Sequence, residues 1–170
     1  MSKLLIGFSK SKKKFAPYAK LIMFLDKCPF SHVYVRIPRA SGVDVIYQAA
    51  GSVVNFVGTK RFQTHSEIVE EFEFEVTDET RNKFFDWAIK YAGTPYSMKA
   101  ALGIGLAILF RLHKNPLCPA SPTVCSLLAG FVLQDFLNAK IDLDALGIAG
   151  PKEIYNVCEG IKSGNTDNKN

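Results

Sequence analysis

Apolar and polar side chains alternate along several short segments of the chain, which is the pattern of half-buried β-strands. Residues 31–37 alternate strictly, so that His32, Tyr34 and Arg36 share one face and β-branched side chains share the other. Residues 71–76 alternate in the same way, with Phe and Val inward and glutamates outward. We predict strands over residues 4–8, 31–37, 43–49, 52–57 and 71–76.

Elsewhere apolar residues recur every three or four positions, which predicts helices. Pro17 opens one such stripe, and Thr77 is expected to cap a second helix that Gly93 ends. Ser97 can cap a third helix, which is apolar over residues 100–110. That apolar run falls well short of the roughly 18–20 residues that a membrane-spanning helix requires. We therefore expect a core helix, with a membrane-surface helix as the second interpretation.

The last predicted helix follows Ser121 and Pro122, which are expected to be its N-cap and its first helical residue. Cys125 then falls in the first turn of that helix. Strands and helices follow one another without regular alternation, which argues for an α+β fold. We expect a single domain over residues 1–160. Residues 161–170 are rich in Gly, Asn, Asp and Lys and are expected to form a disordered tail.

The composition is that of a folded chain. Of 170 residues, 48% are hydrophobic and 22% are charged, which excludes a disordered or fibrous protein. The net charge of +5 owes much to four lysines within residues 10–14. No aromatic side chains interleave with them and no recognition motif accompanies them, so we expect a solvated surface and no nucleic-acid partner.

The four cysteines are widely separated along the chain, at Cys28, Cys118, Cys125 and Cys158. The first residues do not form a secretory signal, so we expect free thiols in a reducing, cytoplasmic compartment. Three of these cysteines, with His32 and His113, could be considered as metal ligands. Their spacing matches no zinc signature, so we expect no metal and no other cofactor.

Two neighbouring strands bring polar groups together in the expected hairpin. If Arg36 lies opposite Asp44, opposed residue numbers sum to 80, and opposite charges face each other. The same register places His32 opposite Gln48, on the same face of the sheet. The amide oxygen could then fix the tautomer of the imidazole, as it must be fixed in a catalytic histidine.

The predicted position of Cys125 at a helix start favours a reactive thiol. The unpaired backbone N–H groups and the helix dipole stabilise a thiolate there and lower its pKa. The same N–H groups could hold the oxyanion of a tetrahedral intermediate. The alternatives are that Cys125 is a small buried hydrophobe and that His32 is a structural histidine. His65 lies in a polar stretch and is expected in a surface loop, and the Arg36–Asp44 pair is expected to be structural only.

Four short segments occur in a characteristic order: Phe30-Ser31-His32-Val33, Val45-Ile46-Tyr47-Gln48-Ala49, Gly93-Thr94-Pro95-Tyr96 and Cys125-Ser126-Leu127-Leu128. In this order they resemble the circularly permuted branch of the NlpC superfamily of papain-like cysteine hydrolases, the YiiX-like and lecithin–retinol-acyltransferase-like proteins. In that branch the histidine strand precedes the cysteine helix, the reverse of papain. Pro151-Lys152-Glu153-Ile154-Tyr155 is similar to the closing segment of the family, so the resemblance spans residues 4–155.

The resemblance implies a papain-like core, an antiparallel sheet packed against helices, in circularly permuted order. It implies a cysteine hydrolase or acyltransferase in which Cys125 is the nucleophile and His32 the general base. Gln48 takes the place of the polar third residue, and Tyr96 forms a polar wall of the site. The substrate would carry an amide or ester bond in a peptide, a cell-wall peptide or a lipid-like acyl compound. The apolar helix and the lysine cluster slightly favour a hydrophobic substrate or a peripheral contact near a membrane, but a core helix explains the apolar run equally well, so the sequence leaves the substrate class open.

Two positions depart from the family pattern. Gln48 stands where relatives often carry an acidic residue or histidine, and an amide stabilises an imidazolium less well than a carboxylate does. Leu127 stands where relatives commonly carry Glu. These departures keep an alternative open, in which the chain is a catalytically silent binding or structural protein that retains the fold.

Overall fold

The computed structural model describes residues 1–13, 17–39, 41–117, 123–141 and 147–164. Five strands form one sheet in the order β4-β3-β2-β1-β5, and every neighbouring pair is antiparallel. The strands are β1 (Ser2–Ser11), β2 (His32–Ile37), β3 (Val45–Ala50), β4 (Val53–Gly58) and β5 (Ser66–Val76). The described helices are α1 (Pro17–Asp26), α2 (Thr59–His65), α3 (Asp78–Tyr91), α4 (Met98–Phe110), α5 (Cys125–Leu137) and α7 (Pro151–Lys162).

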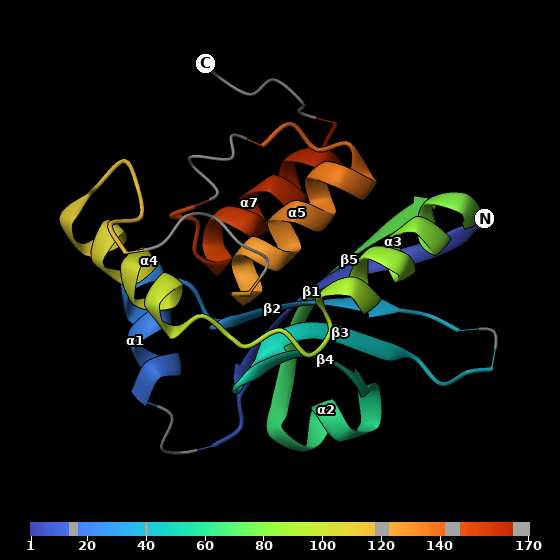
Figure 1. Ribbon diagram of the computed structural model, residues 1–170, viewed down its shortest axis with the longest axis horizontal. Helices are drawn as coiled ribbons and strands as arrows, with labels where there is room; N and C mark the ends of the chain where they lie inside the picture. Colours follow the sequence, from blue (N-terminus) through green and yellow to red (C-terminus); the bar gives the residue numbers. More distant parts are fainter. Residues whose placement is uncertain (14–16, 40, 118–122, 142–146, 165–170) are drawn as a thin grey trace.

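The helices lie on both faces of the sheet and at one of its ends. The helices α3, α5 and α7 cover one face, α2 lies against the other, and α1 and α4 pack together at the end (Figure 1). The expected α+β class, with an antiparallel sheet packed against helices, is confirmed, and the arrangement is consistent with a papain-like core. The helix α7 extends to Lys162, two residues into the segment expected as a tail, and residues 165–170 lie outside the described part.

The main core lies between the sheet and α3, α5 and α7. Inward side chains of β1, β2 and β5 meet the apolar side of α5, where Leu127, Leu128 and Leu133 are fully buried. The alternation predicted for residues 31–37 is confirmed, because Val33, Val35 and Ile37 all belong to this core. The opposite face carries a smaller apolar cluster, in which Tyr34 and Ile46 pack against Phe62 of α2.

The pairing of β2 with β3 differs from the predicted register by two residues. Arg36 lies opposite Ile46 rather than Asp44, and opposed residue numbers sum to 82. Because side chains in a strand alternate with a period of two, a shift of two residues keeps every side chain on its expected face. Arg36 consequently still reaches Asp44 diagonally, at 2.8 Å, and also pairs with Glu71.

The helix caps predicted at Thr77 and Ser97 are present, whereas the loop predicted around His65 is not. The Thr77 hydroxyl accepts the N–H of Thr80 at the start of α3, and the Ser97 hydroxyl accepts that of Ala100 at the start of α4. Gly93 follows α3 with φ +84°, a conformation that glycine adopts without strain. The expected loop around His65 is wrong, since residues 59–65 form α2 and His65 is its last residue.

Gly7 is required in β1 because the fully buried ring of Tyr34 covers its backbone, and a Cβ atom there would overlap that ring. The Tyr34 hydroxyl is fixed in turn by donating to Glu71 Oε1 at 2.8 Å. We expect Gly7→Ala to lower the free energy of unfolding by about 1–3 kcal/mol, measured by urea denaturation. Gly58→Ala is the control, because a Cβ at Gly58 meets nothing within 4 Å. Equal losses in the two variants would contradict this account of the Tyr34 contact.

Candidate active site

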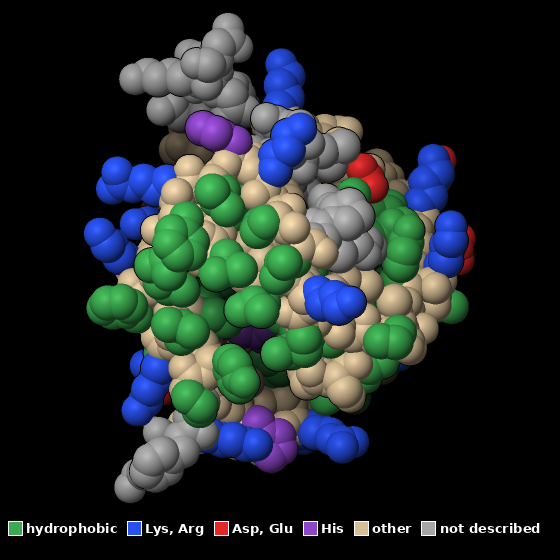
Figure 2. Space-filling view, turned by 60° about the vertical axis from the view of Figure 1, so that its left-hand side comes forward, with side chains coloured by type: hydrophobic (Ala, Val, Ile, Leu, Met, Phe, Trp, Pro, Cys, Tyr) green, Lys and Arg blue, Asp and Glu red, His purple; other side chains and the backbone are tan. Residues whose placement is uncertain are grey.

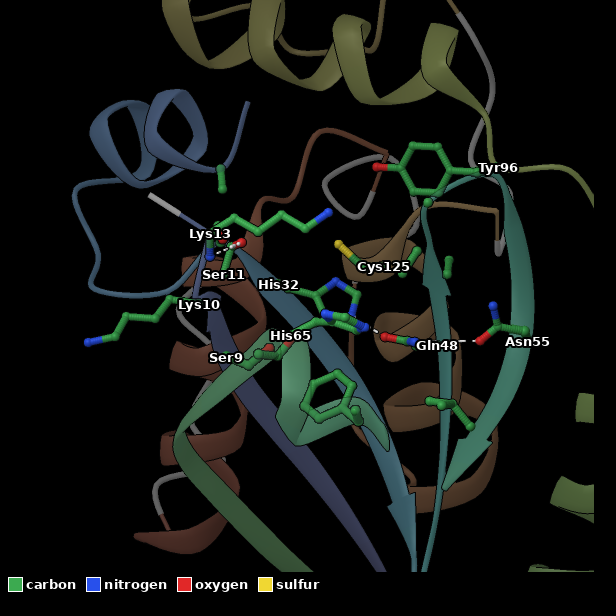
Figure 3. A pocket seen from close by; sticks show the side chains of 18 of the residues that line it. Ser9, Lys10, Ser11, Lys13, His32, Gln48, Asn55, His65, Tyr96 and Cys125 are labelled. Atoms are coloured by element: carbon green, nitrogen blue, oxygen red, sulfur yellow. Dashed lines mark hydrogen bonds between the residues drawn. The ribbon is translucent and has the colours of Figure 1, made fainter. Parts of the chain in front are cut away.

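A pocket of about 660 Å³ opens at the end of the sheet where β2 begins. All four residues expected in the site line it: His32 from β2, Gln48 from β3, Tyr96 from the segment before α4, and Cys125 from α5. Figure 3 shows the imidazole, the amide and the thiol on neighbouring elements around this pocket. Residues about ninety positions apart in the sequence are therefore brought to one cavity.

The His32 ring is held by an amide chain that runs across the sheet. Its Nε2 lies 2.8 Å from Gln48 Oε1, and Gln48 Nε2 donates to Asn55 Oδ1 at 3.5 Å (Figure 3). An amide oxygen can only accept a hydrogen bond, so Nε2 must be the nitrogen that carries the proton. The lone pair is then on Nδ1, which is the nitrogen able to take a proton from another group. The predicted contact of His32 with Gln48 is present, although the two residues are diagonal rather than directly opposed.

Cys125 lies closer to the helix start than predicted. It is the first residue of α5 and Val124 is the N-cap, whereas Ser121 and Pro122, expected in these roles, lie outside the described residues. Since Val124 has no side-chain acceptor, the first-turn N–H groups of α5 are left without a side-chain cap from that position. The backbone N–H groups of Val33, Ser126 and Cys125 itself act on the sulfur and lower its pKa.

Burial has the largest effect on the pKa values of both Cys125 and His32. It raises the pKa of the Cys125 thiol, and the backbone N–H groups offset this only in part. The expected lowering of the Cys125 pKa is therefore wrong in its net direction: the side chain is only 6% exposed, and the loss of solvent outweighs the helix start. Burial also lowers the pKa of His32 to about 4, with the Gln48 hydrogen bond acting in the opposite sense.

The resting pair is consequently a neutral thiol and a neutral imidazole at pH 7. No hydrogen bond joins the Cys125 thiol to the His32 ring within the described part of the chain. The two groups instead line the same pocket, with the thiol also close to the backbone of Val33, the residue after His32. Such a pair can act as nucleophile and general base when a substrate closes the gap, since catalytic hydrogen bonds often tighten only in the complex.

Tyr96 forms the opposite wall of the opening. Its backbone N–H donates to Ser52 O, next to the bridge between Pro95 and Val53, so the tyrosine is fixed to the edge of β4. In Figure 3 its ring projects over the pocket from that side. Burial raises the Tyr96 pKa above its usual range, and the nearby charge of a Cys125 thiolate adds to the rise. The hydroxyl therefore stays protonated and can donate a hydrogen bond into the site.

Two polar residues of the site were not foreseen. Asn55 lies directly opposite Gln48 in the β3–β4 hairpin and orients its amide. Ser9 lies opposite His32 in the β1–β2 ladder, is fully buried, and its hydroxyl has no partner within the described residues. The Gly51-Ser52 pair, a turn signal between two predicted strands, could have revealed the Gln48–Asn55 pairing. No comparable local signal marks Ser9.

The remaining candidates have structural or surface roles. Lys10 pairs with Glu67, and Lys12 donates to Gln63 O, so part of the lysine cluster is tied to α2 and β5. His65 is exposed at the rim of the pocket. Across the described ranges, no group of three or more His, Cys, Asp or Glu side chains could hold a metal ion, and Cys118 lies outside those ranges.

Comparison with known proteins gives one distant similarity. The chain is 29% identical over 148 residues to Carboxypeptidase S of Saccharomyces cerevisiae. The alignment covers 82% of this chain and 24% of the yeast protein, so the chain spans about a quarter of the length of the relative it matches. No family model matches the chain.

Proposed function

We propose that this protein is a cysteine hydrolase or acyltransferase with a circularly permuted papain-like core, acting on an amide or ester bond. The observation that carries the proposal is the shared pocket, in which a helix-start thiol faces a histidine whose tautomer is fixed by an amide. The distant similarity to a protein named as a carboxypeptidase supports the broader class of hydrolase. It bears on no particular residue of the site.

In the proposed reaction, Nδ1 of His32 takes the proton of the Cys125 thiol as the sulfur attacks the carbonyl carbon of the substrate. The first-turn N–H groups of α5 and the hydroxyl of Tyr96 stabilise the negative oxygen of the tetrahedral intermediate. His32 then returns the proton to the leaving amine or alcohol, and a thioester remains on Cys125. Water or another acceptor, deprotonated by His32, releases the acyl group.

The neutral state of Cys125 and His32 at rest determines when the proton moves in the proposed reaction. Because burial holds His32 unprotonated and the Cys125 thiol protonated, proton transfer would accompany attack rather than precede it. The same observation favours the alternative function, a catalytically silent protein that binds a ligand in this pocket. A thiol with a raised pKa is a poor nucleophile unless a base acts on it.

An acyl-enzyme experiment separates the two functions. The folded protein is incubated with a p-nitrophenyl ester at neutral pH, and peptide mapping by mass spectrometry then locates the acyl group. We expect acylation of Cys125, in preference to the half-buried Cys28 and the fully buried Cys158, which serve as internal controls. Absence of acylation at Cys125 together with absence of p-nitrophenol release, or acylation no faster there than at Cys28, would exclude the hydrolase and leave the binding protein.

The amide of Gln48 is expected to contribute by orienting His32. Gln48→Leu keeps a similar volume and removes the acceptor, so we expect kcat/KM for the ester to fall by about tenfold to a hundredfold. Gln48→Glu restores the acceptor and adds a charge that stabilises the imidazolium, so activity should match or exceed that of the wild type. If both variants lose activity equally, the Gln48 contact is not what positions His32.

A further inference from the structure

A large apolar surface lies beside the candidate active site. Most of the exposed large hydrophobic side chains of the described residues belong to α1, α4 and the segment after α4. Figure 2 shows a face of the molecule on which hydrophobic side chains gather around a hollow, with most of the Lys and Arg side chains toward its edges. The members are Tyr18, Leu21, Phe24, Met98, Leu102, Leu109, Phe110, Leu112 and Leu117, and we call them the α1–α4 face.

The helix α4 is apolar on all sides over residues 100–110, as a fully buried helix would be, but only one of its sides packs against the rest of the protein. Its inner side, at Ala100, Gly103 and Ile104, is buried, while Leu102 and Leu109 on the other side are exposed. Its neighbour α1, which packs against it, exposes Phe24 to 77%. Soluble monomers rarely expose contiguous apolar surface of this kind unless something binds it. The α1–α4 face therefore needs an occupant.

The exposed charged side chains of the two segments that carry this face are all positive. Residues 17–27 and 98–117 contain five Lys and Arg side chains, all exposed: Lys20, Lys27, Lys99, Arg111 and Lys114. The one acidic side chain in the two segments is Asp26, which is only 6% exposed. An apolar centre with a cationic rim is complementary to an anionic lipid surface, where the apolar groups enter the acyl boundary and the cations meet the headgroups.

We propose that the α1–α4 face docks onto an anionic lipid bilayer and holds the protein at the membrane surface. None of the described helices is long and apolar enough to cross a membrane, so this contact would be peripheral. Docking would bring the bilayer next to the candidate site. An apolar pocket of about 60 Å³, lined by Leu25 of α1 and Ile108 of α4, reaches Cys125 from beneath this face.

The proposal does not depend on the chemistry of Cys125. Membrane binding rests on exposed side chains of α1 and α4, so Cys125→Ala should bind vesicles as the wild type does even if it loses all acyl transfer. Failure of the hydrolase proposal and failure of the docking proposal are therefore distinguishable.

Vesicle sedimentation tests the proposal. The protein is mixed with vesicles of phosphatidylcholine alone or of phosphatidylcholine with phosphatidylserine. We expect binding to the vesicles that contain phosphatidylserine, and weaker binding when NaCl rises from about 0.1 M to about 1 M. The double variant Phe24→Ser with Phe110→Ser should bind at least about tenfold more weakly. Both side chains are mostly exposed, at 77% and 65%, so circular dichroism should show an unchanged fold.

Ile89→Ser is the matched control, because Ile89 is 64% exposed but lies on α3, away from α1 and α4. Its binding should equal that of the wild type. Vesicle binding that is absent, equal for both lipid mixtures, or unchanged in the double variant would overturn the proposal. A dimer in gel filtration that the double variant dissociates, without vesicle binding, would also overturn it and assign the face to a second copy.

Discussion

Replacing His32 with alanine is expected to lower kcat/KM for ester hydrolysis by about 10²–10⁴-fold, because the variant lacks the base that takes the proton of Cys125. The rate should depend strongly on His32 because burial raises the pKa of the Cys125 thiol, so little thiolate exists at neutral pH without a base. Initial rates of p-nitrophenol release at several ester concentrations measure the effect. His113→Ala is the control, because His113 is exposed beyond α4 and should leave the rate unchanged.

The pH profile of the wild type tests the same role independently. His32 must be neutral to accept a proton, and burial lowers its pKa to about 4. The rate should therefore be retained as the pH falls through 6.5, the ordinary pKa of histidine, and be lost only near pH 4. An acidic limb near pH 6.5 would show that the His32 ring is solvated during turnover. A rate in His32→Ala equal to that of the wild type would remove His32 from the mechanism.

Leu127→Glu, which introduces the residue common at this position in the resembled family, is expected to lower the free energy of unfolding by about 3–5 kcal/mol. Leu127 is fully buried in the main core, two residues after Cys125. A carboxylate there would lose its hydration without a partner in the apolar cluster around it. Urea denaturation at pH 7 gives the change in unfolding free energy.

Leu127→Met is the control that distinguishes the effect of the added charge from the effect of the changed side-chain shape. It conserves volume and polarity, and we expect it to cost less than about 1.5 kcal/mol. The loss caused by Leu127→Glu should also shrink as the pH falls toward about 4, because burial raises the pKa of the carboxyl in the folded state and the group is then protonated in both the folded and the unfolded chain. If Leu127→Glu were as stable as the wild type at pH 7, the departure from the family pattern would have no structural cause.

Side-chain alternation specified much of the sheet because it is a local property. The faces of residues 31–37 and 71–76 follow from period-two patterns, and both sets of inward side chains lie in the main core. The register of β2 against β3 was less well determined. A cross-strand charge pair such as Arg36 with Asp44 can form directly or diagonally, so it fixes the face but not the register.

In the candidate site too, the sequence indicated some properties and only the tertiary structure decided the others. The sequence by itself indicated which side chains carry chemistry and which face each occupies: His32 and Gln48 on one face of neighbouring strands, Cys125 at a helix start. Only the tertiary structure brought α5 against the start of β2 and decided that the thiol pKa rises rather than falls. The reason is physical: strand faces and helix caps depend on residues a few positions apart, whereas burial and the approach of distant groups depend on how the whole chain packs.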